Sequence, residues 1–184
     1  MPEGRYAIFE SRIVFFLPTE KSYAALFDPG ASFENYLVAN HLSAGVSERF
    51  SGLLALRQHY LQSLKASELG STLRPDAALH HYGDFACQHV GSILAENYSL
   101  KDFYHPVVAA IARADELDGT GLLPTLRAYL KYPDAPGRAA EELFVHKNTL
   151  FYRMNKIRSQ FGLDLSRGNE RLRVQFTLAL MELG

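Results

Sequence analysis

With 184 residues, 47% of them hydrophobic and 21% charged, the chain has the composition of a folded globular protein, not of a disordered or fibrous one. The formal net charge is −1, and the single cysteine, Cys87, excludes an internal disulfide framework and a structural zinc site of the usual kind. No apolar run approaches the roughly 20 residues that span a bilayer, and no basic stretch followed by an apolar one begins the chain, so we expect a cytoplasmic protein without a membrane partner.

The first segment of the chain predicts a β-hairpin. Residues 6–17 hold two β-branched and aromatic runs around the polar turn Glu10-Ser11-Arg12. Further along, leucines at helical spacing predict a helix with Ser51 as its N-cap and Gly70 as its C-terminal stop. Weaker patterns predict, in chain order, a helix from Phe33, a strand over 42–46, a strand over 78–82 and a helix capped by Asp84.

A change of pattern separates the two parts of the chain. Residues 100–114 predict a helix with Pro106 near its start, and Asp118-Gly119-Thr120-Gly121 then breaks the chain. After Leu122 only helices are predicted. We therefore expect an α+β protein, with a small N-terminal α/β sheet domain followed by an all-α domain.

Three predicted helices follow one another closely after Leu122. The first ends before Pro133, because proline disfavours helical geometry in the residue that precedes it. The second is a compact helix that contains Ala139, Ala140, Leu143 and Phe144, and its small alanines allow a neighbouring helix to approach closely. After the turn Val145-His146-Lys147, the third helix covers about Asn148–Phe161, with Asn148 as an N-cap candidate.

The third helix has one apolar and one polar face. Leu150, Met154, Ile157 and Phe161 lie within about 60° of one another at 100° per residue, which predicts a buried stripe. The opposite face carries amides, hydroxyls, aromatics and cations, and residues 143–163 contain four basic residues and no acid. From Leu122 onward the chain has ten Lys and Arg residues and six Asp and Glu residues, whereas the preceding part has nine Lys and Arg residues and fourteen Asp and Glu residues. The positive charge is therefore concentrated where an anionic partner would dock.

Such a face suits the major groove of DNA, where amides bond adenine edges and lysine reaches guanine or phosphate. The N-terminal end of the helix also favours phosphate through its positive dipole. The alternative is the solvated face of an ordinary helical domain, and the residue pattern alone leaves both open. The candidate DNA-binding residues are His146, Lys147, Asn148, Thr149, Phe151, Tyr152, Arg153, Asn155 and Lys156.

The runs 122–130 and 139–154, continued by Phe161-Gly162-Leu163, closely resemble the C-terminal helix-turn-helix of the PucR/CdaR family of bacterial transcriptional regulators. The turn and third helix also look like the DNA-binding end of the Fis nucleoid protein, which implies DNA contacts for His146, Lys147, Thr149 and Tyr152. Phe151 departs from the family, which often has arginine there, so a phosphate contact would be replaced by apolar contact with base or sugar. The resemblance implies a sequence-specific regulator that binds double-stranded DNA, without catalytic activity or a cofactor.

The first part resembles the family's middle domain, a degenerate relative of the GGDEF diguanylate cyclases, through Gly45-Val46-Ser47 and 53–70. The acidic, glycine-bearing catalytic turn of active cyclases is missing from the predicted hairpin. We therefore assign residues 1–98 to a partial GGDEF-like regulatory or dimerisation domain. Residues 99–184 form the PucR-type C-terminal region, with the helix-turn-helix core at 122–184. Because one helix-turn-helix reads only a half-site, we also expect a homodimer or higher homo-oligomer. A small-molecule effector of unknown identity is left open as a further partner.

Other readings of the sequence are open or weaker. One alternative is that the helical domain serves protein contacts instead of DNA, beside a dimerisation or effector-response module. Another is that the cyclase-like part retains nucleotide binding. Cys87 with His89 and the pair His80-His81 suggests a metal or nucleophile site, but adjacent strand residues point to opposite faces. We expect a buried cysteine, surface histidines and no metal site. His105, before Pro106, is assigned a structural role.

Overall fold

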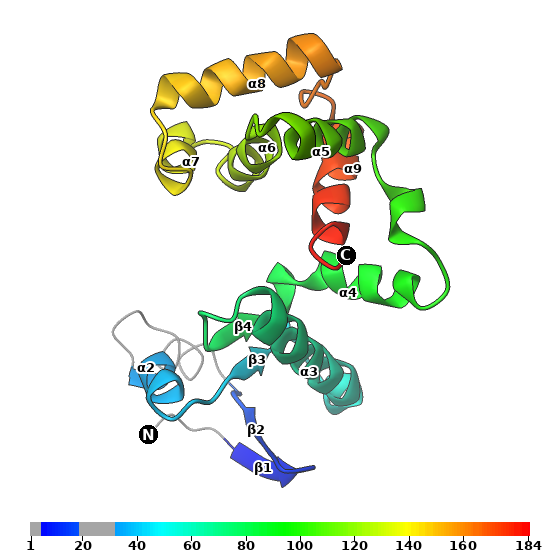
Figure 1. Ribbon diagram of the computed structural model, residues 1–184. Helices are drawn as coiled ribbons and strands as arrows, with labels where there is room; N and C mark the ends of the chain where they lie inside the picture. The colour runs from blue at the N-terminus through cyan, green and yellow to red at the C-terminus, as the bar shows by residue number, and fades with distance from the viewer. Residues whose placement is uncertain (1–4, 19–31) are drawn as a thin grey trace. The chain divides into compact units, whose positions relative to one another are not determined.

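The computed structural model describes residues 5–18 and 32–184. The chain divides into two compact units, 1–86 and 87–184. This division falls twelve residues before the boundary that we expect after residue 98, and helix α4 (Ala86–Ala95) begins at it. The expected α+β class is confirmed, since small sheets are confined to the first unit and the second is helical (Figure 1).

The predicted hairpin is present in the first unit. Strands β1 (Arg5–Phe9) and β2 (Arg12–Phe16) pair in antiparallel register, with Phe9 opposite Arg12. Glu10 and Ser11 form the turn with φ of 47° and 62°. Two successive positive φ values characterise the two-residue turn whose twist matches that of the flanking strands.

The rest of the first unit is built on two short parallel strands. Helix α2 (Ser32–Ala39) precedes β3 (Ala44–Val46), and β3 pairs with β4 (Leu79–His81). Helix α3 (Leu56–Leu73) links the two strands and packs against both (Figure 1). A Cβ atom at Gly45 would collide with the α3 backbone, which is why helix and strand can approach so closely.

Helix α3 differs from its prediction at both ends. A 3-10 turn over Leu53–Ala55 with Gly52 as its N-cap precedes the helix, so Ser51 is not an N-cap. Gly70 does not stop the helix, which continues to Leu73. The absence of a side chain at Gly70 is instead required by packing, because a Cβ there would collide with the ring of His80.

The expected exposure of two titratable side chains is wrong. His80 is 2% exposed, and its ring meets Phe85 edge-on at 6.0 Å between centroids. Burial, together with the neighbouring His81, lowers the pKa of His80. Cys87 is exposed, not buried. Within the described residues no three His, Cys, Asp or Glu side chains gather so as to hold a metal ion.

The second unit is a bundle of helices around two apolar clusters. After α4 come α5 (Pro106–Asp118), α6 (Leu122–Lys131), α7 (Pro136–Glu142), α8 (Lys147–Phe161) and α9 (Gly168–Leu180). One cluster joins α5, α6, α8 and α9, with Ile111, Leu126 and Ile157 among its buried members. The smaller one joins α6, α7 and α8 around Ala139, Ala140 and Leu150. None of the helices in the described ranges is long and apolar enough to cross a membrane.

The helix predicted over 100–114 is two elements. Leu100–Phe103 is a 3-10 turn, and the α-helix begins only at Pro106. The fixed φ of proline suits the first helical position, where its missing N–H is not needed. His105 is the N-cap of α5 and is buried, at 3% exposed.

Candidate nucleic-acid interface

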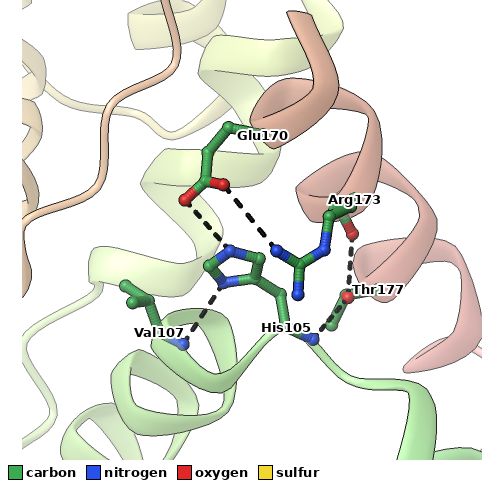
Figure 2. A network of polar contacts seen from close by, with 5 residues as sticks. All are labelled: His105, Val107, Glu170, Arg173 and Thr177. Atoms are coloured by element: carbon green, nitrogen blue, oxygen red, sulfur yellow. Dashed lines mark hydrogen bonds and ion pairs between the residues drawn. The ribbon is translucent and has the colours of Figure 1, made fainter. Parts of the chain in front are cut away.

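The His105 side chain connects α5 to α9 within the helical unit that carries the candidate interface. Its Nδ1 accepts from the Val107 N–H at 3.2 Å, while Nε2 lies 3.0 Å from Glu170 Oε1 on α9. Its backbone N–H donates to Thr177 Oγ1 at 2.8 Å (Figure 2). With Nδ1 as an acceptor, the ring donates from Nε2 to the carboxylate. The structural role expected for His105 is therefore confirmed.

Helix α8 starts one residue earlier than expected, and a different residue caps it. His146 is the N-cap, and its Nδ1 accepts from the Asn148 N–H at 3.2 Å. Asn148 is thus not the N-cap but the second residue of the helix. At the other end Gly162 has a φ of 70°, the left-handed conformation in which helices commonly end.

The two faces of α8 follow the predicted pattern. Leu150 and Ile157 are 0% and 1% exposed, and Met154 and Phe161 on the same stripe are partly buried against the larger cluster. Six of the nine candidate residues are exposed, namely His146, Lys147, Asn148, Phe151, Tyr152 and Asn155. Thr149, Arg153 and Lys156 are half-buried. The periodicity of the sequence therefore separates core from surface correctly on this helix.

Arg153 lies apart from the exposed group. Its Nη1 is 3.4 Å from Thr125 Oγ1 on α6, and a Cβ at Gly121 would come within 3.0 Å of the same atom. The guanidinium therefore points toward the start of α6. This position follows from the angle of residue 153, which lies between the buried stripe and the outward face.

Asp115 on α5 organises the start of α6 and was missed as a positioning residue in the sequence. Its carboxylate accepts hydrogen bonds from the Thr120 hydroxyl and from the N–H groups of Leu122 and Leu123, the last two at 2.9 and 2.6 Å. Partial burial alone would raise the pKa of Asp115, but these hydrogen bonds and the charge of Arg153 lower it. The sequence signal for this role is the position of Asp115, in the last turn before the Gly119-Thr120-Gly121 break and a new helix.

Glu142, the last residue of α7, is paired within the domain. Glu142 accepts from Lys131 Nζ at 2.6 Å and from the Tyr132 hydroxyl at 2.8 Å. The hydrogen bond from Lys131 lowers the pKa of Glu142, which therefore stays ionised and paired. On α8, Lys147 Nζ lies 5.8 Å from the centroid of the Phe151 ring. From Leu143 to Leu163 the charged residues are all basic, so the start of α8 has a cationic character.

Phe144 was expected within the second helix, and this is wrong. Helix α7 ends at Glu142, and Phe144 follows in the turn with a φ of 53° and with 96% of its surface exposed. Ala139, Ala140 and Leu143 do pack against Leu150, as the smaller cluster shows. Helical periodicity could not locate Phe144, because the helix ends before it.

Comparison with known proteins gives this arrangement a family. Residues 122–180, which hold α6 to α9, match the PucR C-terminal helix-turn-helix domain. The proline-responsive transcriptional activator PutR of Bacillus subtilis is 26% identical over 184 residues, covering 94% of this chain and 44% of that protein. The carbohydrate diacid regulator of Escherichia coli is 28% identical over 134 residues, covering 72% of this chain and 34% of its own.

The purine catabolism regulatory protein of Bacillus subtilis is 25% identical over 142 residues, which are 77% of this chain and 26% of that protein. The chain thus spans less than half the length of these relatives. No solved structure matches it. Residues 122–180 of the chain therefore form a PucR C-terminal helix-turn-helix domain, and the relatives that the chain resembles are transcriptional regulators of the PucR/CdaR type.

Proposed function

We propose that this chain is a non-catalytic, sequence-specific regulator that inserts the N-terminal half of α8 into the major groove of DNA. The observation that carries the proposal is the exposed face of α8, which is polar, cationic and free of acid from Leu143 to Leu163. The opposite face is buried in the domain. A rigid helix with this division presents side chains to a groove without disturbing its own core.

The start of α8 supports phosphate contact through side chains more than through the backbone. His146 already accepts from the N–H groups of the first turn, through Nδ1 for Asn148 and through its carbonyl for Thr149. The positive end of the helix dipole remains, and the Lys147 ammonium adds a full charge beside it. We therefore assign phosphate contact to Lys147, with His146 holding the turn.

Base reading falls to the exposed polar residues farther along the helix. Asn148, Tyr152 and Asn155 share the outward face, and amides of this kind pair with the N6 and N7 edge of adenine. Thr149 and Lys156 flank this face and are half-buried, so they suit the walls of the groove. Arg153 is better placed to fix α8 against α6 than to touch DNA, because its guanidinium faces Thr125.

One helix-turn-helix reads a half-site, so we propose that two copies act together on half-sites about 34 Å apart. The N-terminal region, with its assignment to a degenerate GGDEF-like domain over 1–98, remains the proposed site of self-association and of response to an effector. The names of the relatives refer to proline, carbohydrate diacids and purines. A small metabolite is therefore the proposed class of effector.

The test compares Lys147→Ala, Asn148→Ala and Tyr152→Ala with the unaltered chain on duplexes selected from genomic fragments. Each side chain is exposed and the cap is His146, so melting temperatures should change little, within about 0.5 kcal/mol of unfolding free energy. Lys147→Ala should weaken binding to all duplexes and lower the slope of log affinity against log salt by about one. The Asn148 and Tyr152 variants should relax base preference at one position by about 1–3 kcal/mol.

Lys101→Ala is the matched control, since it removes an exposed lysine of the same unit away from α8. Its affinity should equal that of the unaltered chain. Unchanged affinity in all three α8 variants would contradict the proposal and would favour protein contacts as the role of this domain.

A further inference from the structure

Phe144 combines a strained backbone conformation with an exposed aromatic ring. Its φ of 53° lies in the left-handed region, where glycine is favoured and a bulky side chain is strained. Its ring is 96% exposed, so no burial in the domain compensates for that strain. The backbone is nevertheless held there, because the Phe144 N–H donates to Glu141 O at 3.0 Å and the Val145 N–H to Ala140 O at 3.0 Å.

The position of this ring is defined by the turn between α7 and α8 (yellow in Figure 1). Phe144 stands two residues before His146, the cap of α8, and three before Lys147. It therefore adjoins the cationic start of the helix but lies outside the helix itself. After Phe144 the charged residues up to Leu163 are all basic, whereas before it Glu142 is paired with Lys131 and Glu141 is exposed. An exposed aromatic ring beside the cationic start of α8 fits an anionic partner that also offers apolar surface.

We infer that the Phe144 ring packs against deoxyribose of the DNA backbone at the edge of the groove that α8 enters, an inference that rests on the proposed function. A residue in the turn before the helix meets the edge of the groove, whereas residues on the helix meet its floor. The sugar carbons are the apolar part of that edge. Because sugars carry no sequence information, this contact adds affinity and positions the turn without selecting a base.

The experiment uses the full chain and the selected genomic duplexes, cut to about 30 base pairs, long enough for two half-sites, together with single-base variants of them. Phe144→Gly and Phe144→Asn remove the ring but keep residue types that adopt the left-handed turn. Their melting temperatures should equal or exceed that of the unaltered chain, while affinity falls roughly three- to tenfold. The salt slope should not change, because no charge is lost.

Two further variants complete the design. Phe144→Tyr keeps the ring and should retain affinity. Leu172→Ala removes a different exposed apolar side chain, 64% exposed on α9, and should leave affinity unchanged. A Phe144→Gly chain that binds as tightly as the unaltered one would overturn the inference. So would a change of base preference in that variant, since the ring would then meet a base.

The two hypotheses fail in distinguishable ways. If Lys147→Ala weakens binding and Phe144→Gly does not, the DNA-binding role stands and the sugar contact is wrong. If Lys147→Ala, Asn148→Ala and Tyr152→Ala all leave binding unchanged, the proposed function itself is contradicted.

Discussion

Replacement of Asp115 by alanine tests how the helix-turn-helix is held together. The substitution removes the acceptor for the N–H groups of Leu122 and Leu123 and for the Thr120 hydroxyl. Lost helix-capping bonds to a charged acceptor cost about 1–2 kcal/mol each, and water compensates part of this at a half-buried site. We expect a loss of about 2–3 kcal/mol in the unfolding free energy of the second unit.

For a unit of this size such a loss lowers the melting temperature by roughly 10 to 20 °C. Circular dichroism of the intact chain measures the shift, and hydrogen exchange at the amides of Leu122 and Leu123 reports the local effect. Asp118→Ala is the control, because it removes an exposed carboxylate from the same helix. If Asp115→Ala melts within 2 °C of that control, taken as the order of the noise in such a comparison, the positioning role of Asp115 is refuted.

The contribution of Asp115 also has a predicted pH dependence. Its pKa is lowered in the folded state, so its stabilising effect is fully present above the unfolded value of about 3.9. The effect is lost as pH falls through the lower folded pKa. The difference in stability between the unaltered chain and Asp115→Ala should therefore be constant near neutral pH and shrink only in strong acid. A difference that shrinks already between about pH 7 and 5 would contradict the assignment.

Three other substitutions test the packing. Ile157→Asp places a charge at a site 1% exposed, costs several kcal/mol and should unfold the helical unit, seen as lost cooperative melting. His105→Ala removes the cap of α5 and the contact with Glu170, so it should lower the free energy of unfolding in denaturant by about 2 kcal/mol. An unchanged free energy of unfolding would contradict the structural role of His105. Gly70→Ala forces a Cβ into the His80 ring and should destabilise the first unit by about 1–3 kcal/mol, with exchange protection in the second unit unchanged.

The sequence predicts best where a regular helix is long enough for its period to be seen. On α8 the spacing of Leu150 and Ile157 separates the buried stripe from the face that carries Asn148 and Tyr152. The hairpin also follows from two β-rich runs around a short polar turn. In both places, local pattern and tertiary packing favour the same answer.

Predictions fail where a tertiary contact decides. Gly70 reads locally as a helix stop, but it lies inside α3 because His80 requires the space. Arg153 is one of the candidate DNA-binding residues, and the sequence does not show that its guanidinium lies near Thr125 and Gly121 at the start of α6; a DNA contact by Arg153 stays a prediction. Phe144 reads as part of the second helix, because nothing local shows that α7 ends at Glu142.

Contact between the start of α8 and DNA is tested most directly by hydrogen exchange of the intact chain, measured with and without duplex. Added duplex should protect amides over about residues 144–156 more than those of any other segment. Protection confined to other parts of the chain, with none at the start of α8, would contradict it.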